Sequence, residues 1–309
     1  MPILLIFTLI GSGWAQKNLS FDETYHQALK KYHNNNYDGA IADFDKLIAT
    51  YLQTRSSQHR FNGASPADET IAISYDNVVV LVPRTAAIYS ARGLACFAKG
   101  SMQDAIRDFE SATAIAPNFD EAFVNLGVAR QAAGDLQGAI EAYKKAILIR
   151  PVNAVAFYNL GTAYYLQKEY DLALENLTKS IELYPQKETA FLNRGNAWLE
   201  KGYNDKAFDD YQTALKLNNK SAGANCNLGV IYFIRRDYTT AASYFNRAIN
   251  LDAKLHSAYL NRGMLRYAQG NQAEADKDFD KCETLDSGCK QQAMGKMKKW
   301  SEYNLASKK

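Results

Sequence analysis

Hydrophobic and polar residues follow one pattern that repeats every 34 residues, six times without an insertion, from residue 86 to residue 289. A glycine recurs at the same place in every copy, at Gly93, Gly127, Gly161, Gly195, Gly229 and Gly263. An alanine follows each glycine at a constant interval, at Ala105, Ala139, Ala173, Ala207, Ala241 and Ala275. A large apolar residue follows each alanine, as Phe109, Tyr143, Leu177, Tyr211, Phe245 and Phe279. The pattern predicts six copies of one structural unit, at 86–119, 120–153, 154–187, 188–221, 222–255 and 256–289.

Each unit is predicted to be a pair of antiparallel helices. With residue 86 as position 1, positions 4, 7, 8 and 11 share one side of a first helix, which we expect to face the core. The position-8 glycine costs about 1 kcal/mol inside a helix but lets a second helix approach closely. We expect the position-20 alanine of the second helix to lie against it. Stop signals separate the helices at Gly100, Gly134, Gly202 and Gly270, and end units at Pro117, Pro151 and Pro185.

Six units of this kind resemble the tetratricopeptide repeat family. The third unit shows the resemblance best, with Phe157, Leu160-Gly161, Tyr164, Ala173, Leu177 and Pro185 in the places that the family prefers. The resemblance covers two thirds of the chain. It implies an all-α fold, a right-handed superhelical solenoid of antiparallel helix hairpins whose stability is shared among neighbouring repeats.

The resemblance also implies that positions 2, 6, 9 and 13 of the first helices line a concave groove. From the second unit to the sixth, only Glu121 and Glu200 are charged at these positions. Asparagine recurs at position 6, and once at position 9, giving Asn125, Asn159, Asn193, Asn196, Asn227 and Asn261. An asparagine amide can bond both the N–H and the C=O of an extended peptide. These residues therefore resemble the peptide-holding asparagine rows of the O-linked N-acetylglucosamine transferase superhelix, although inherited repeat sequence explains them equally well.

The chain starts with an apolar run, Met1–Ala15, followed by Gln16. The run is too short to cross a bilayer, which takes about 20 apolar residues. It predicts a signal peptide cleaved after Ala15, and hence a protein exported to the periplasm or cell envelope. No basic residue precedes Lys17, so an apolar cap on the first helix pair, in a cytoplasmic protein, is the alternative.

Three further segments flank the repeats. Residues 21–54 resemble a degenerate helix pair of the same kind, with Ala40 and Phe44 at the repeat spacing. Residues 55–85 break the period and are expected to form a loop and then a small β-hairpin around Asp76-Asn77. Residues 290–309 are expected to form a capping helix and a basic tail.

Composition limits the chemistry. The 36 basic and 33 acidic residues give a net charge of only +3, which does not indicate a nucleic-acid partner. The nucleotide-binding, metalloprotease and serine-hydrolase motifs are missing from the sequence, so no catalytic residue, metal, cofactor or small-molecule substrate is predicted. Of the four cysteines, Cys282 and Cys289 lie seven residues apart and could form a disulfide if the protein is exported.

The sequence therefore predicts a non-catalytic scaffold that binds a protein or peptide along the asparagine-lined groove. The alternative is a structural or assembly subunit of a cell-envelope complex, which would use the convex face or the 55–85 insert. Nothing in the sequence indicates an oligomeric state.

Overall fold

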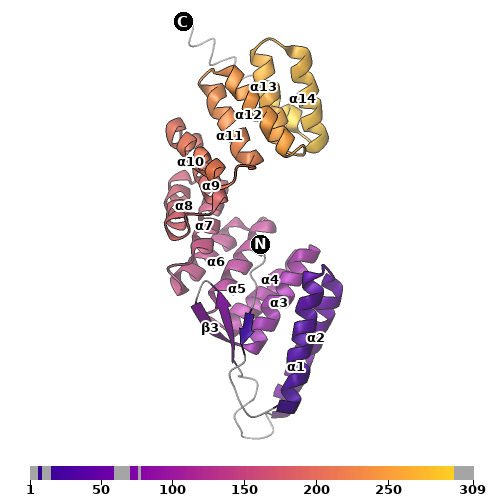
Figure 1. Ribbon diagram of the computed structural model, residues 1–309. Coiled ribbons are helices and arrows are strands. Elements are labelled where there is room, and N and C mark those ends of the chain that lie inside the picture. Colours follow the sequence, from indigo (N-terminus) through magenta and orange to yellow (C-terminus); the bar gives the residue numbers. More distant parts are fainter. Residues whose placement is uncertain (1–5, 9–14, 59–69, 76–77, 296–309) are drawn as a thin grey trace. The chain divides into compact units, whose positions relative to one another are not determined.

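The computed structural model describes residues 6–8, 15–58, 70–75 and 78–295 (Figure 1). The chain divides into two compact units, which we call the N-terminal unit, 1–167, and the C-terminal unit, 168–309. Within the described residues, no helix is long and apolar enough to span a membrane.

The N-terminal unit contains a three-stranded sheet and the first seven helices. Its elements are β1 (Ile6–Thr8), α1 (Ala15–His33), α2 (Tyr37–Gln58), β2 (Thr70–Tyr75), β3 (Val78–Pro83), α3 (Arg84–Lys99), α4 (Met102–Ile115), α5 (Asp120–Ala132), α6 (Leu136–Ile149) and α7 (Ala154–Leu166). The C-terminal unit contains α8 (Tyr170–Leu183), α9 (Glu188–Glu200), α10 (Asn204–Leu217), α11 (Ala222–Ile234), α12 (Tyr238–Leu251), α13 (His256–Ala268) and α14 (Gln272–Leu285).

The helices follow the phase of the sequence repeat, and the predicted fold of stacked helix hairpins is confirmed. Each first helix is followed by a short turn and a second helix, as in α3 and α4 or α9 and α10. Gly100, Gly134, Gly202 and Gly270 adopt the left-handed conformation that ends the first helices, with φ between 80° and 91°. The division into two units falls inside the third repeat, between α7 and α8.

The contact at the position-8 glycine differs from the one expected. Its nearest neighbour on the second helix is the aromatic ring at position 24, rather than the position-20 alanine. This is so for Gly93 with Phe109, Gly127 with Tyr143, Gly195 with Tyr211, Gly229 with Phe245, and Gly263 with Phe279. The alanines are fully buried as well. The ring extends farther than a methyl group, so it fills the space that the missing Cβ leaves.

The two helices of a repeat are joined by the same ion pair in three of the six repeats. An arginine at position 7 bonds an aspartate at position 23 of its own unit in the pairs Arg92–Asp108, Arg194–Asp210 and Arg262–Asp278. The other three repeats have leucine at position 7, as Leu126, Leu160 and Leu228, and no aspartate at position 23. The two positions therefore change together between units.

The first helix pair is longer than expected. Helix α2 continues to Gln58, through the start of the predicted loop, because glycine and proline are absent from 55–58 and first follow at Gly63 and Pro66. Asn35 forms the turn between α1 and α2 with φ of 60°, which asparagine tolerates well. Phe44 of α2 is fully buried and contacts Tyr25 of α1 edge to face, with ring centroids 5.7 Å apart.

Strands β2 and β3 form an antiparallel hairpin, with Ile73 opposite Val80. Val82, at the end of β3, is buried with Phe119 and Ala122, which fixes the hairpin to the first two repeats. The apolar start of the chain contributes β1, whose Phe7 pairs with Ile73 on the other edge of β2. Part of the predicted leader is thus a strand, whereas cleavage after Ala15 stays a prediction.

Candidate functional site

Two groove-face asparagines of neighbouring repeats bond each other in the C-terminal unit. Asn227 Nδ2, on α11, donates to Asn196 Oδ1, on α9, over 2.9 Å. The hydroxyl of Tyr211 donates to the same oxygen over 2.8 Å. Because Asn196 Oδ1 accepts both bonds, its amide orientation is set, and no described residue bonds its Nδ2. Asn227 Oδ1 has no donor among the described residues either.

This pair presents one amide donor, Asn196 Nδ2, and one amide acceptor, Asn227 Oδ1, from two adjacent helices. A peptide unit of an extended chain offers the complementary C=O and N–H groups. Both residues are partly buried, so neither side chain is free to rotate as an exposed one would be. The pair is therefore suited to hold main chain without reading a side chain.

The asparagine of the next repeat is engaged differently. Asn261 Nδ2, on α13, lies 3.5 Å from the sulfur of Cys226, on α11. Ser257 Oγ lies 3.9 Å from the same sulfur. Position 9 of the fifth repeat is Val230, so Asn261 of the sixth repeat has no amide partner of the kind that Asn227 finds in Asn196. Asn193 is partly buried and makes an interaction of its own.

In the N-terminal unit, the amide nitrogen at one end of the predicted row is buried. Asn125 Nδ2 is buried and has no hydrogen-bond partner among the described residues. One carboxylate oxygen of Glu121 is buried as well. Burial raises the pKa of the Tyr25 hydroxyl on α1, and the charge of Glu121 raises it further. The first helix pair therefore brings Tyr25 close to Glu121, and a peptide-binding role for Asn125, whose amide nitrogen is buried, stays a prediction.

Asn159, on α7, is partly buried, and its side chain bonds no other described residue. The exposed side chains of Val155 and Leu166 share its face of α7. Asn159 thus lies between apolar neighbours on this face.

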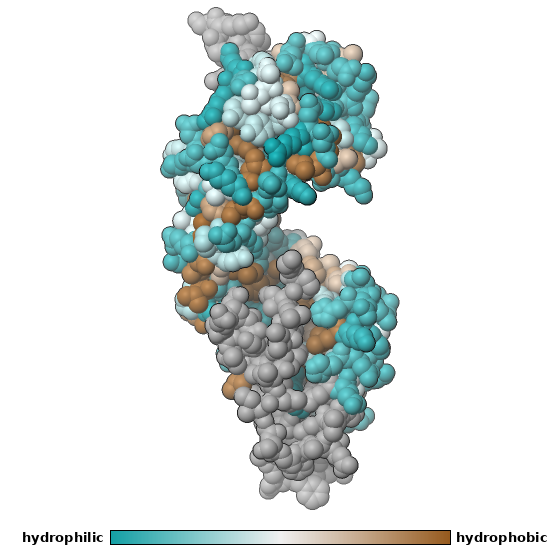
Figure 2. Space-filling model, viewed as in Figure 1, coloured by the Kyte–Doolittle hydropathy of each residue, from teal (hydrophilic) through white to brown (hydrophobic). Residues whose placement is uncertain are grey.

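The groove face of the C-terminal unit is nearly neutral. Its charged residue is Glu200, which is exposed and bonds Tyr170. Desolvation raises the pKa of the Tyr170 hydroxyl, and the charge and hydrogen bond of Glu200 raise it further. Val230 and Met264 are partly buried, and Ile234 is 45% exposed. Figure 2 shows hydrophobic residues over α9 and α11 among polar ones. Amides and apolar side chains therefore dominate this face.

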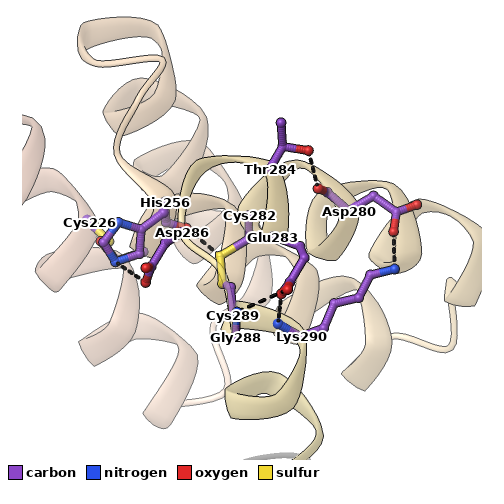
Figure 3. Close-up of a disulfide and its surroundings, with 11 residues drawn as sticks. Cys226, His256, Asp280, Cys282, Glu283, Thr284, Asp286, Gly288, Cys289 and Lys290 are labelled. Carbon is purple, nitrogen blue, oxygen red and sulfur yellow. Dashed lines mark hydrogen bonds and ion pairs between the residues drawn. A yellow bond between two sulfur atoms is a disulfide. The ribbon is translucent and has the colours of Figure 1, made fainter.

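The two cysteines at the C-terminal end are joined in the structure. Cys282 and Cys289 form a disulfide with their Cα atoms 5.8 Å apart, and both are buried (Figure 3). Glu283 accepts the backbone N–H groups of Gly288, over 3.0 Å, and Lys290, over 2.8 Å, which lowers the pKa of its carboxyl. Whether Cys282 and Cys289 are oxidised in the cell depends on export, so the disulfide in the cell stays a prediction.

The other two cysteines lie inside the repeats. Cys96 and Cys226 are buried thiols that form no disulfide, and burial raises the pKa of the Cys96 thiol to about 11. In the part of the chain that the structure describes, His, Cys, Asp and Glu residues form no group of three that could hold a metal ion.

Sequence reasoning missed the part that Tyr211 plays at the site. Its position predicts a core ring, and the ring is fully buried, but its hydroxyl reaches the groove amide of Asn196. The signal was present in the sequence, because only the fourth unit has asparagine at position 9, next to the position-6 asparagine of the following unit.

Comparisons with known proteins place this geometry in context. Models described as tetratricopeptide repeat match residues 70–118, 119–186, 222–255 and 256–289, and a model described as TPR repeat matches 195–234. No curated protein matches the sequence.

Several solved structures share the fold. A tetratricopeptide repeat protein from Parabacteroides merdae is 16% identical, with a TM-score of 0.63, over 87% of this chain and 94% of its own. PilF of Pseudomonas aeruginosa is 23% identical, with a TM-score of 0.58, over 66% and 93%. MamA of Desulfovibrio magneticus RS-1 is 25% identical, with a TM-score of 0.51, over 55% and 97%.

Proposed function

Because the chain belongs to the tetratricopeptide repeat family, whose arrays are protein-interaction scaffolds, we propose that it is a non-catalytic scaffold that holds an extended polypeptide on the first-helix face of its C-terminal unit. The Asn196–Asn227 pair is the observation on which the proposal rests. It offers a donor and an acceptor that no described residue uses.

The chemistry of the face suits main-chain binding. A hydrogen bond contributes about 1 kcal/mol net, and an unmet buried group costs more than that. Two bonds to one peptide unit would therefore contribute about 2 kcal/mol and also set the register of a bound chain. The apolar residues Val230, Ile234 and Met264 supply surface for burial, with about 25 cal/mol gained per Å² of apolar area removed from water. A neutral or apolar segment is the partner that this face fits.

A second candidate function uses the insert instead of the groove face. Leu81 of β3 is 58% exposed although its neighbour Val82 is fully buried. An assembly subunit of an envelope complex would use such a surface. Substitutions that weaken binding would then fall in 70–83 and leave the asparagine pair unaffected.

The test is selection of peptides from a displayed library of random dodecamers against the full chain. Selected peptides should lose at least tenfold in affinity for Asn227→Ala, about 1.4 kcal/mol. The matched control is Asn250→Ala, because Asn250 is exposed on α12, outside the groove face. Equal affinity for the wild type and both variants would overturn the groove proposal and direct the search to the insert.

We also infer export, because the apolar run ends in small residues just before Gln16. The mature protein isolated from cells should then begin at Gln16, which N-terminal sequencing reads directly. A mature chain that retains residues 6–8 would contradict export by this route and would keep β1 as part of the sheet.

A further inference from the structure

We propose that the open space at Gly223, between α9 and α11, is a subsite for one apolar side chain of the bound polypeptide. This inference rests on the proposed function, because it places a side-chain contact next to the main-chain contact of Asn196 and Asn227.

The open space and the asparagine pair both lie between α9 and α11, about one helical turn apart. Gly223 precedes Asn227 by four residues on α11, and Leu192 precedes Asn196 by four residues on α9. Residues four apart share one face of a helix. A Cβ built on Gly223 would meet only the Leu192 side chain, at 3.7 Å, and nothing else within 4 Å. Leu192 is therefore the apolar floor of a space beside the amide pair.

Between α11 and α13, the next two first helices, side chains fill the corresponding space. There, Ser257 of α13 stands where Gly223 stands on α11, and Cys226 stands where Leu192 does. Their side chains meet, with Ser257 Oγ 3.9 Å from the Cys226 sulfur. Position 2 has a side chain in the other groove-lining repeats too, as Glu121, Val155 and Thr189. The missing side chain at Gly223 is thus particular to the α9–α11 pair.

The backbone gives no reason for this glycine. Gly223 lies in the first turn of α11 and does not have the positive φ that favours glycine. The position-8 glycines, such as Gly195, instead leave room for an aromatic ring. A helical glycine without such a contact costs up to about 1 kcal/mol relative to alanine. A bound side chain that occupies this space would explain why residue 223 is glycine.

Charge near the subsite indicates which side chain it takes. Glu188 is held by Ser221, at the N-terminal end of α11, and by Asn218. Glu200 lies one turn beyond Asn196 on α9. Both charges are negative, so an acidic side chain is disfavoured, and the Leu192 floor favours an apolar one. In an extended chain, alternate side chains point to opposite faces, so one residue can reach Leu192 while a neighbouring peptide unit meets the asparagine pair.

The test uses three synthetic peptides, Gly-Ser-Gly-X-Gly-Ser-Gly, with X as Leu, Ala or Asp. Binding to the full chain is followed by NMR through the side-chain amide signals of Asn196 and Asn227. The Leu peptide should bind at least tenfold more tightly than the Ala peptide, and the Asp peptide should bind most weakly. Gly223→Leu should abolish the preference for Leu, whereas the control Ser243→Leu, which adds the same side chain to the exposed face of α12, should leave it unchanged.

The outcomes separate the two proposals. If the three peptides shift the asparagine signals equally, the Gly223 subsite is overturned and the groove proposal stands. If none shifts them at the highest soluble concentration, both are overturned. Gly223→Leu should also raise the thermal midpoint, because the space is open. A lower midpoint would show that the side chain clashes there, and would overturn the subsite as well.

Discussion

Arg194 of α9 bonds both carboxylate oxygens of Asp210 on α10. Its Nε lies 2.9 Å from Oδ2 and its Nη2 lies 2.7 Å from Oδ1. The remaining nitrogen, Nη1, reaches Thr178 Oγ1 of the preceding repeat over 3.2 Å. The guanidinium also lies over the ring of Phe191, 5.6 Å from its centroid. One arginine thus connects the two helices of its own hairpin to the hairpin before it.

Breaking this pair should be costly, because Asp210 is only 5% exposed. Arg194→Leu should lower the free energy of unfolding by about 3 kcal/mol, since it leaves a buried carboxylate unpaired. Adding Asp210→Ala should restore most of the loss, because Leu126 and Ala142 occupy these positions in the second repeat. Urea unfolding followed by circular dichroism measures both. A double variant no more stable than Arg194→Leu would contradict this account.

The two kinds of helical glycine should respond oppositely to alanine. At Gly195, an added Cβ would lie 2.5 Å from Cε1 of the buried Tyr211 ring. We expect Gly195→Ala to destabilise the protein by about 2 kcal/mol through overpacking. At Gly223 the nearest atom is 3.7 Å away, so Gly223→Ala should stabilise by up to about 1 kcal/mol. Thermal melts of the two variants provide each other's control, and a shift in the same direction would refute the distinction.

Asn225 lies at position 4 of the fifth repeat, where the other five repeats have an aromatic residue. It is fully buried, and its Oδ1 has no hydrogen-bond partner among the described residues. Its Nδ2 bonds Ser221 O, which also accepts the backbone N–H of Asn225. Asn225→Leu should therefore stabilise the protein by about 1 kcal/mol, because it removes an unmet acceptor and leaves no new one. Asn225→Asp, which keeps the shape but adds charge, should destabilise it.

The disulfide should hold the C-terminal end against the last hairpin. Cys289 and Ala293 are buried together with Phe279 of α14. Closing a loop of this length contributes about 2.5 kcal/mol in the chain-entropy account. Reduction should therefore speed hydrogen exchange at 289–294, whereas α9 is unaffected. Protein isolated from cells should resist alkylation at both cysteines until reductant is added, and ready alkylation beforehand would contradict an oxidised pair.

Acid should loosen the same end through Glu283. Its pKa is lowered from 4.5 by the N–H groups of Gly288 and Lys290, so it binds protons less readily in the folded state. Its contribution is complete above pH 4.5 and is lost as the pH falls through the lowered value. The amide signals of Gly288 and Lys290 should move in that range in an NMR titration. Glu283→Gln should remove this dependence, and an unchanged titration in the variant would assign it to another group.

Sequence alone was sufficient for the repeated hairpin, its phase and most of its core. Helical periodicity and the spacing of glycine, alanine and aromatic residues are local properties that six copies reinforce, as the match of α9 and α10 to the fourth repeat shows. The position-6 asparagines were also visible, although the sequence did not distinguish their surroundings. The extent of α2 was underestimated, because a helix without packing signals has no marked end before the next glycine or proline.

Contacts between neighbouring repeats could be determined only from the tertiary structure. The sequence places Asn125 and Asn227 in equivalent positions, but only their neighbours determine that one amide is enclosed and the other bonds Asn196. The pairing of β1 with β2, residues far apart in the chain, likewise has no local signal. Periodicity specifies which face of a helix a residue occupies. What stands opposite that face depends on side chains from other repeats, and only packing brings these together.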